Sequence, residues 1–333
     1  MKRSTLYVVG DRLGWSIDDD RMRLVATVRR LGYEVGSNVL LRFLRGRSVF
    51  QHNHFDALQP RWVESSHRLG LSYFHGRPGT EGYPEFDRAY DTLRRHATRI
   101  ERVQVTHDEI RELVVGAGVA EERVFKIPIG IDLEHFSVAP ERNSSSFVVG
   151  SFVKDGVGMA EGLEPKLLKG PDIFVAVIAR LRGQIPELSV MLTGPARGYV
   201  RRELERFGVP YEHRLLSSRD ELGLAYRGVD VCLVTSRQEG GPKSALEAMA
   251  SGVPFVSTRV GQAAELVRDG ENGLLADVDD VDALVAAVER VHDDAELRAR
   301  LRVAGPATAE AYAEERLDPL WAELLEGFVE RAR

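Results

Sequence analysis

Short apolar runs alternate with longer amphipathic segments along most of the chain. The alternation is clearest in the second half, where Val229–Thr235 and Val253–Val256 are predicted to be buried parallel strands. Between them a glycine-containing loop leads into a predicted helix from about Lys243 to Ser251, which Gly252 ends as a left-handed cap and Pro254 cannot continue. This strand–loop–helix–strand unit predicts an α/β sheet, and such sheets bind ligands at the carboxyl ends of their strands.

The same alternation extends into the first half of the chain. Strands are expected near residues 4–9, 71–74, 103–106 and 123–127, with helices between them. A polar segment, Ser137–Ser146, then separates the two halves. Because 333 residues exceed what one core usually holds, we expect two domains with a boundary near this segment.

The composition is that of an ordinary soluble globular protein, with 43% hydrophobic and 29% charged residues. No apolar run reaches the roughly 18 residues that a membrane-spanning helix needs, and the N-terminus enters a strand without a signal peptide. Cys232, the only cysteine, lies inside a predicted strand, so no disulfide can form within the chain. A cytoplasmic location is therefore expected.

Charge differs between the two predicted domains. Residues 1–138 hold 21 basic and 19 acidic side chains, and the remainder holds 24 and 32. A mildly basic first domain would suit an anionic substrate or a weak peripheral contact with a membrane, although the imbalance is small. We expect no nucleic-acid partner.

Two patterns contain residue types that bind metals. The adjacent aspartates Asp18–Asp20 fit the cap and first turn of a helix better than they fit one ion. The pair His52 and His54 lacks a third ligand, and a role on the acceptor side is the alternative. We predict no metal site and no cofactor.

Two carboxylates mark the central unit, Glu239 on the loop and Glu247 inside the helix. The backbone amides of Lys243, Ser244 and Ala245 open that helix, where unpaired N–H groups and the macrodipole favour a phosphate. Glu239 and Glu247 would then lie on either side of the phosphate. A nucleotide diphosphate sugar has this layout, with sugar hydroxyls, diphosphate and ribose hydroxyls in order.

A structural alternative exists for the same residues. Ser244-Ala-Leu-Glu247 also matches a capping box, in which Glu247 only satisfies a backbone N–H. The wider pattern favours the functional interpretation, because Glu239-Gly and Leu246-Glu-Ala-Met-Ala-Ser-Gly-Val-Pro254 resemble the two-glutamate signature of family 4 retaining glycosyltransferases, which have the GT-B fold. The usual aromatic-glycine pair after the first Glu-Gly is replaced by Gly241-Pro242-Lys243, so the sugar pocket differs in shape.

Lysine is scarce, and its positions support this resemblance. Of six lysines, three lie at Lys154, Lys166 and Lys169 and one at Lys243. An ammonium beside phosphate would explain the clustering, and a solvated face is the alternative. The resemblance places Lys154 where the family usually has a phosphate-facing arginine, and it places Lys169 at the second basic position.

The resemblance also implies roles for other residues. It makes His75 a strand-end histidine near the sugar, Gly14 part of a loop near the donor phosphates, and Arg214-Leu215 a backbone contact for the base. It assigns catalysis to His75, Glu239, Lys154 and Lys169. It assigns donor binding to Gly14, Lys154, Lys169, Arg214, Leu215, Glu239, Gly240, Gly241, Pro242, Lys243, Ser244, Ala245 and Glu247.

The resemblance implies two Rossmann-like domains facing a cleft. Residues 1–138 would bind the acceptor, 139–313 the nucleotide sugar, and 314–333 would return as a helix to the first domain. The expected activity is metal-independent, retaining transfer from a UDP sugar, with a GDP sugar as second candidate. The acceptor (a glycan, a lipid-linked sugar or a small molecule) and the oligomeric state are left open. A nucleotide-sugar 2-epimerase and a non-catalytic nucleotide-sugar-binding protein are the alternatives.

Overall fold

A computed structural model of the chain describes residues 5–10, 16–38, 41–52, 66–138, 140, 142, 144–158 and 160–329, with only the backbone for 16–18 and 42. The residues up to Pro128 and those from Glu314 onward form one compact unit, the N-terminal unit. The residues from Ile129 to Ala313 form the C-terminal unit. Among the described residues, no helix combines the length and the apolar character needed to cross a bilayer.

The first boundary therefore falls ten residues before the predicted one. The side-chain amide of Gln262 explains the difference, because its oxygen accepts from the Ile129 N–H at 2.7 Å and its nitrogen donates to the Ile129 carbonyl at 3.0 Å. The Ile131 N–H donates to the Tyr312 carbonyl at 3.0 Å. The chain that follows Pro128 is thus held by the C-terminal unit.

The C-terminal unit contains a six-stranded parallel sheet in the order β12-β11-β10-β7-β8-β9. The direction in which successive strands are added reverses between the neighbours β7 and β10, and this switch point is where such sheets bind ligands. The strands are β7 (Phe147–Ser151), β8 (Leu188–Thr193), β9 (Tyr211–Arg214), β10 (Val231–Val234), β11 (Phe255–Thr258) and β12 (Leu274–Ala276).

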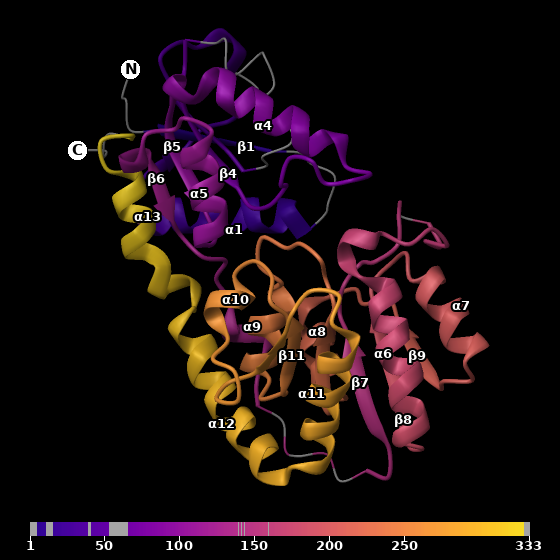
Figure 1. Cartoon of the computed structure of the whole chain (residues 1–333). Helices are drawn as coiled ribbons and strands as arrows, with labels where there is room; N and C mark the ends of the chain where they lie inside the picture. Colours follow the sequence, from indigo (N-terminus) through magenta and orange to yellow (C-terminus); the bar gives the residue numbers. More distant parts are fainter. Residues whose placement is uncertain are drawn as a thin grey trace. The chain divides into compact units, whose positions relative to one another are not determined.

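Alternation along the strands builds two cores in this unit. Val149 and Val231 belong to one core with α6 and α11, whereas Val148 and Cys232 belong to the other with α9, since successive side chains point to opposite faces. Figure 1 shows these helices around the sheet. The helices are η4 (Leu133–His135), η5 (Leu167–Lys169), α6 (Pro171–Gln184), α7 (Gly198–Arg206), α8 (Arg219–Tyr226), α9 (Lys243–Ala250), α10 (Ala263–Leu266), α11 (Val281–Asp293) and α12 (Ala295–Ala311).

The N-terminal unit contains a second six-stranded parallel sheet, in the order β2-β1-β3-β4-β5-β6. Leu93 of α4 and Val114 of α5 belong to one of its cores, and Leu24 of α1 and Trp321 of α13 to the other. The strands are β1 (Thr5–Val9), β2 (Glu34–Val35), β3 (Ser48–Gln51), β4 (Arg68–Tyr73), β5 (Ile100–Val105) and β6 (Val124–Lys126). The helices are α1 (Ser16–Arg30), η1 (Leu41–Phe43), α4 (Pro84–His96), η2 (Ala97–Arg99), α5 (Asp108–Gly116), η3 (Glu121–Arg123), η6 (Glu314–Leu317) and α13 (Asp318–Leu325).

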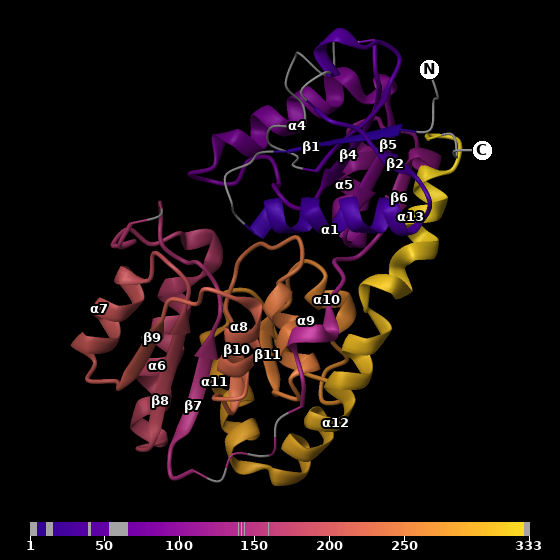
Figure 2. The ribbon, with the colours of Figure 1, turned by 180° about the vertical axis from the view of Figure 1, so that it is seen from behind.

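The end of the chain completes this N-terminal core. In both views α13, drawn in yellow, lies beside β6 and α1 (Figures 1 and 2). The Trp321 ring packs edge-on against Phe50 of β3, with centroids 5.9 Å apart. The Arg30 guanidinium donates to both oxygens of Asp318 at 2.6 Å.

Several predicted boundaries are corrected by the structure. Helix α1 already begins at Ser16, so Asp19 and Asp20 lie within it. Strand β11 begins two residues later than predicted, because the Val253 N–H still donates to the carbonyl of Ala248 at the end of α9. The left-handed cap at Gly252 is confirmed by its φ of +66°. Gly14 and His54 lie outside the described residues.

Candidate active site

The loop that carries Glu239 follows β10 and is held by three neighbouring segments. The Arg237 N–H donates to the Leu168 carbonyl at 2.9 Å, and the Gln262 N–H donates to the Gly240 carbonyl at 3.2 Å. The Thr258 hydroxyl donates to the carbonyl of Ser236 at 2.6 Å. These bonds fix the backbone on both sides of Glu239 at the carboxyl end of the sheet.

Glu239 forms an ion pair with Lys169. Lys169 Nζ lies 2.7 Å from Glu239 Oε2, and the Ser236 hydroxyl donates to Oε1 at 2.7 Å. The two charged side chains are 20% and 8% exposed, respectively. The structure thus brings together two of the residues predicted to be catalytic. Lys169 keeps N–H groups for a further acceptor, since an ammonium carries three donors.

Gly170 explains how Lys169 comes so close to β10. Its φ is +62°, and a Cβ atom at this position would lie 1.9 Å from the Thr235 carbonyl oxygen. The Thr235 hydroxyl in turn donates to the Gly170 carbonyl at 2.8 Å. Only glycine permits both the left-handed backbone and this contact, so the Lys169-Gly170 pair sets the position of the ammonium.

Helix α9 begins as predicted, but without a capping box. Pro242 is its N-cap residue, no side chain caps it, and Ser244 already lies inside the helix. The Ser244 hydroxyl is buried and has no hydrogen-bond partner within the described part of the chain. The capping-box alternative is therefore wrong. The first-turn amides at Lys243, Ser244 and Ala245 lie at the end of the helix that favours an anion, although the Ala245 N–H already donates to the Pro242 carbonyl at 2.9 Å, so it is not the unpaired donor that was predicted.

Glu247 is oriented by residues of α8. The Tyr226 hydroxyl donates to Glu247 Oε2 at 2.9 Å, and an Arg219 guanidinium nitrogen lies 3.8 Å from Oε1. Burial raises the pKa of Tyr226 well above its usual value, and the neighbouring Glu247 raises it further, so the hydroxyl remains a donor. The Tyr226 ring stacks on Phe152, which directly follows β7, with centroids 4.0 Å apart.

Lys154 follows β7, and Glu239 follows β10. Because β7 and β10 are neighbours in the sheet, both residues lie at its switch point. Lys154 is partly buried, and this burial lowers the pKa of its ammonium. A phosphate beside Lys154 would offset that desolvation by supplying a negative partner.

Arg214 and Leu215, the predicted base contacts, lie at the carboxyl end of β9. The Arg214 side chain pairs with Glu212 at 2.6 Å, and its carbonyl accepts from the Gly194 N–H at 3.1 Å. Leu215 is 72% exposed. The described contacts link neither side chain to Glu239 or Glu247, and the predicted backbone contact with the base stays a prediction.

His75 lies two residues after the end of β4 in the N-terminal unit and is partly buried. Its ring packs edge-on against Phe86, with centroids 5.7 Å apart. His52 follows the adjacent strand β3 and is buried, with Nδ1 3.1 Å from the Ser72 hydroxyl. Both histidines therefore lie at the carboxyl end of the N-terminal sheet.

Sequence patterns did not identify Ser236 and Tyr226, which orient the two carboxylates. Ser236 is one of many loop hydroxyls, and Tyr226 matches the apolar face of an amphipathic helix. Their partners identify them only in three dimensions. A tyrosine at the end of a helix is too common a pattern to have indicated that it orients Glu247.

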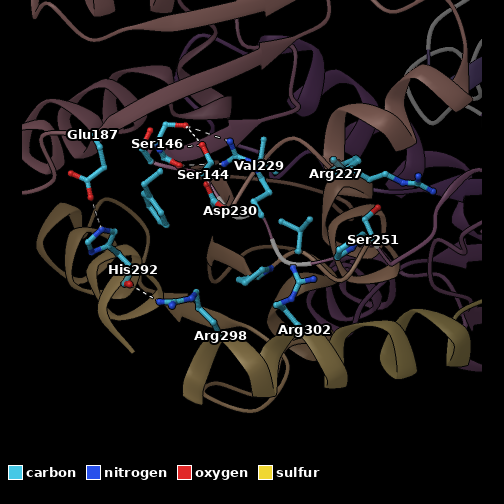
Figure 3. A pocket seen from close by; sticks show the side chains of 17 residues that line it. Ser144, Ser146, Glu187, Arg227, Val229, Asp230, Ser251, His292, Arg298 and Arg302 are labelled. Carbon is cyan, nitrogen blue, oxygen red and sulfur yellow. Dashed lines mark hydrogen bonds and ion pairs between the residues drawn. The ribbon is translucent and has the colours of Figure 1, made fainter. Parts of the chain in front are cut away.

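A cavity of about 310 Å³ lies at the opposite end of the C-terminal sheet, where β7 and β10 begin (Figure 3). Its charged side chains already have protein partners, as Arg142 pairs with Asp230 and His292 with Glu187. It contains none of the predicted site residues.

Comparison with known proteins shows which family and which fold this chain resembles. Residues 156–294 match the family model described as Glycosyl transferases group 1. The chain is 29% identical over 238 residues to D-inositol 3-phosphate glycosyltransferase of Corynebacterium jeikeium and 30% identical over 252 residues to the protein of that name from Nocardiopsis dassonvillei. These alignments cover 66% and 69% of this chain and 56% of each relative. The chain thus spans about half the length of these curated relatives.

Solved structures share the fold over the whole chain. Anabaena Alr3699/HepE in complex with UDP and glucose superposes with a TM-score of 0.76 at 16% identity, covering 97% of this chain and 99% of that one. Sucrose-phosphate synthase from Thermosynechococcus elongatus gives 0.70 at 17% identity, covering 97% and 98%. Together with the family match over residues 156–294, these likenesses bear out the resemblance to the glycosyl transferases of group 1 and show that the chain has the GT-B fold.

Proposed function

We propose that this protein is a retaining glycosyltransferase that takes a sugar from a nucleotide diphosphate sugar, with UDP as the favoured nucleotide. The observation that carries the proposal is the Lys169–Glu239 ion pair beside the start of α9, at the switch point of the sheet. The curated relatives named as glycosyltransferases and the Anabaena structure with UDP and glucose support it.

The donor binds along this edge of the C-terminal sheet. The diphosphate accepts from the first-turn amides of α9 and from Lys154 and Lys169. Glu247, held by Tyr226, accepts from the ribose hydroxyls, and Glu239 accepts from the sugar hydroxyls. The order of these residues matches the order of sugar, diphosphate and ribose in the donor.

Cleavage of the bond between the anomeric carbon and the diphosphate oxygen leaves the electron pair on that oxygen. Lys154, Lys169 and the helix start stabilise this developing charge, so they contribute more in the transition state than in the ground state. The acceptor hydroxyl attacks the same face of the anomeric carbon, and its proton passes to the departing phosphate. The products are a glycoside of unchanged anomeric configuration and the nucleoside diphosphate.

Three further points belong to the proposal. Two ammonium groups and a helix start supply the positive charge that a divalent metal would otherwise bring, so transfer proceeds in the presence of a chelator. The N-terminal unit binds the acceptor, and His75 contacts the sugar or the acceptor. Neither the epimerase nor the non-catalytic alternative is favoured by the names of the relatives.

A ligand screen followed by an activity assay tests the proposal. A nucleotide at 100 times its dissociation constant should stabilise the protein by about 2.7 kcal/mol, so thermal shifts with UDP, GDP and ADP identify the base. Turnover of the matching sugar should then require an added acceptor and should persist with EDTA. The absence of any nucleotide-dependent shift would reject the proposal, and acceptor-independent conversion to another nucleotide sugar would favour the epimerase.

A further inference from the structure

The loop from Lys154 to Lys169 carries the two proposed diphosphate-binding lysines at its ends. It closes on itself near its base, because the Lys166 N–H donates to the Asp155 carbonyl at 2.7 Å. The Val157 N–H donates to the Glu164 carbonyl at 2.9 Å one step further out. The position of Asp155 therefore affects both ends of the loop.

Arg197 is buried against the base of this loop. Its Nε lies 2.9 Å from Asp155 Oδ1, and the two side chains are 0% and 2% exposed. Its terminal nitrogens donate to the carbonyls of Ser151 and Thr193 at 2.9 and 3.0 Å and to the Ser151 hydroxyl at 2.9 Å. One guanidinium thus joins the loop to the carboxyl ends of both β7 and β8.

The loop also packs directly on the segment that carries Arg197. A Cβ atom at Gly156 would lie 2.2 Å from the Ala196 carbonyl oxygen, and one at Gly162 would lie 2.5 Å from Ala196 backbone atoms. Ala196 itself has a φ of +57°, which is unusual for a residue with a side chain. The Gly198 N–H donates to the Glu161 carbonyl at 2.7 Å. Backbone contacts and the ion pair therefore define one loop conformation.

We propose that Arg197 and Asp155 are positioning residues that hold Lys154 and Lys169 for the charge that develops on the leaving diphosphate. This inference rests on the proposed function. A buried ion pair is a poor stabilising device, because desolvation offsets most of its attraction and an apolar pair often serves as well. The Arg197–Asp155 pair can orient the loop, which an apolar pair could not do. Orientation matters because a displacement of about 1 Å in a catalytic group can lower a rate by about 10²-fold.

The first test replaces Asp155 by asparagine, which keeps its shape but removes its charge. We expect Asp155→Asn to lower kcat on the nucleotide sugar by about 10- to 100-fold while the Kd for free nucleoside diphosphate stays within about threefold. Ser151→Ala, which removes only one acceptor from Arg197, should lower kcat less. Asp230→Asn is the matched control, because Asp230 pairs with Arg142 at the other end of the sheet. It should lower Tm with kcat unchanged.

A double-mutant cycle tests whether the pair acts through lysine. In a Lys154→Ala background, Asp155→Asn should cause a smaller further loss of kcat than in the wild-type background, because one of the two lysines that the pair positions is already gone. An equal loss in both backgrounds would overturn the inference, and so would an unchanged kcat in Asp155→Asn and Ser151→Ala.

Amide hydrogen exchange provides a readout that does not depend on activity. Without any nucleotide, Asp155→Asn should speed exchange at residues 154–169 and leave α9 unaffected, whereas Asp230→Asn should leave the loop unaffected. Unchanged exchange in the loop of Asp155→Asn would overturn the inference even if the wild-type protein showed no transfer. Failure of the wild-type protein to bind nucleotide would instead reject the proposed function.

Discussion

Glu239 and Glu247 have different partners, so their variants should fail differently. Glu239→Gln keeps an acceptor for Ser236 but loses the charge that pairs with Lys169. We expect turnover to fall by about 10²-fold, with the Kd for free UDP within about threefold, because the proposed function has Glu239 bind the sugar and not the nucleotide. Steady-state kinetics and titration calorimetry measure the two effects. Glu247→Gln should instead mainly weaken the binding of free UDP. An equal loss of UDP binding in both variants would contradict the assignment of Glu239 to the sugar and Glu247 to the ribose.

The three lysines of the loop provide a second contrast between single residues. Removing one donor aimed at developing charge typically lowers a rate by about 10²–10³-fold, so we expect that loss for Lys154→Ala and Lys169→Ala. Lys166→Ala should be nearly silent, and Lys154→Arg should retain part of the activity because the positive charge is kept. Measuring the turnover and the UDP affinity of the four variants tests which of these lysines stabilise the leaving diphosphate. If Lys166→Ala lowered turnover as much as the other two alanine variants, the resemblance would have placed the wrong lysines at the family's basic positions.

Single residues were predictable where a local pattern marks them and were missed where their partners lie far away in sequence. The spacing of Glu239 and Glu247 and the clustered lysines are local signals. The Lys169–Glu239 pair spans 70 residues and the Tyr226–Glu247 bond spans 21, so only the folded sheet brings these groups together. The buried role of Arg197 was missed because arginine is expected on the surface.

At the scale of secondary-structure elements, Gly170 joins η5 to α6. It is the position near the site where a side chain would be tolerated least. Gly170→Ala would place a Cβ 1.9 Å from the Thr235 oxygen at a φ of +62°. We expect a loss of about 2 kcal/mol or more in the free energy of unfolding, since the left-handed backbone and the overlap both oppose folding. Chemical denaturation measures this loss. Gly183→Ala, inside α6 with nothing within 4 Å of the added Cβ, should instead gain up to about 1 kcal/mol.

A second prediction at this scale concerns η4 and α8, which His135 joins. His135 Nδ1 lies 2.7 Å from Asp220 Oδ1, and this hydrogen bond raises the pKa of the imidazole above its ordinary value of 6.5, with Asp132 adding to the effect. Because the pKa is higher in the folded state, the stabilisation is complete below about pH 6.5 and is lost as the pH rises through the folded-state pKa. The Tm advantage of wild type over His135→Gln should therefore shrink between pH 5.5 and 8.5. A constant difference would contradict the linkage.

Element types followed from periodicity, whereas their ends depended on tertiary contacts. The helix from Lys243 and a strand within Val229–Thr235 were predicted from local apolar patterns and turn residues, and the structure has α9 from Lys243 and β10 over Val231–Val234. The start of β11 and the unit boundary at Pro128 were not, because a bond back to Ala248 and the side chain of Gln262 decide them.

At the scale of the whole molecule, each unit has its own sheet and its own cores, and the chain crosses between them twice. We therefore expect two thermal transitions, of which only the one from the C-terminal unit should respond to nucleotide. The last residues belong to the N-terminal core although they follow the C-terminal unit in sequence. A substitution near the C-terminus should thus affect the unit built mainly from the beginning of the chain.

Trp321→Ala tests this division. Trp321 is 9% exposed and packs against Phe50 in the N-terminal core, to which Leu24 also belongs, so its truncation should cost that unit about 3 kcal/mol. Calorimetry with and without saturating UDP should show the nucleotide-independent transition moving to lower temperature and the nucleotide-responsive one unchanged. Val303→Ala, at a side chain that is 76% exposed on α12, should change neither. If Trp321→Ala lowered the UDP-responsive transition as much as the other, the two units would unfold as one, and the division would not describe how the molecule is stabilised.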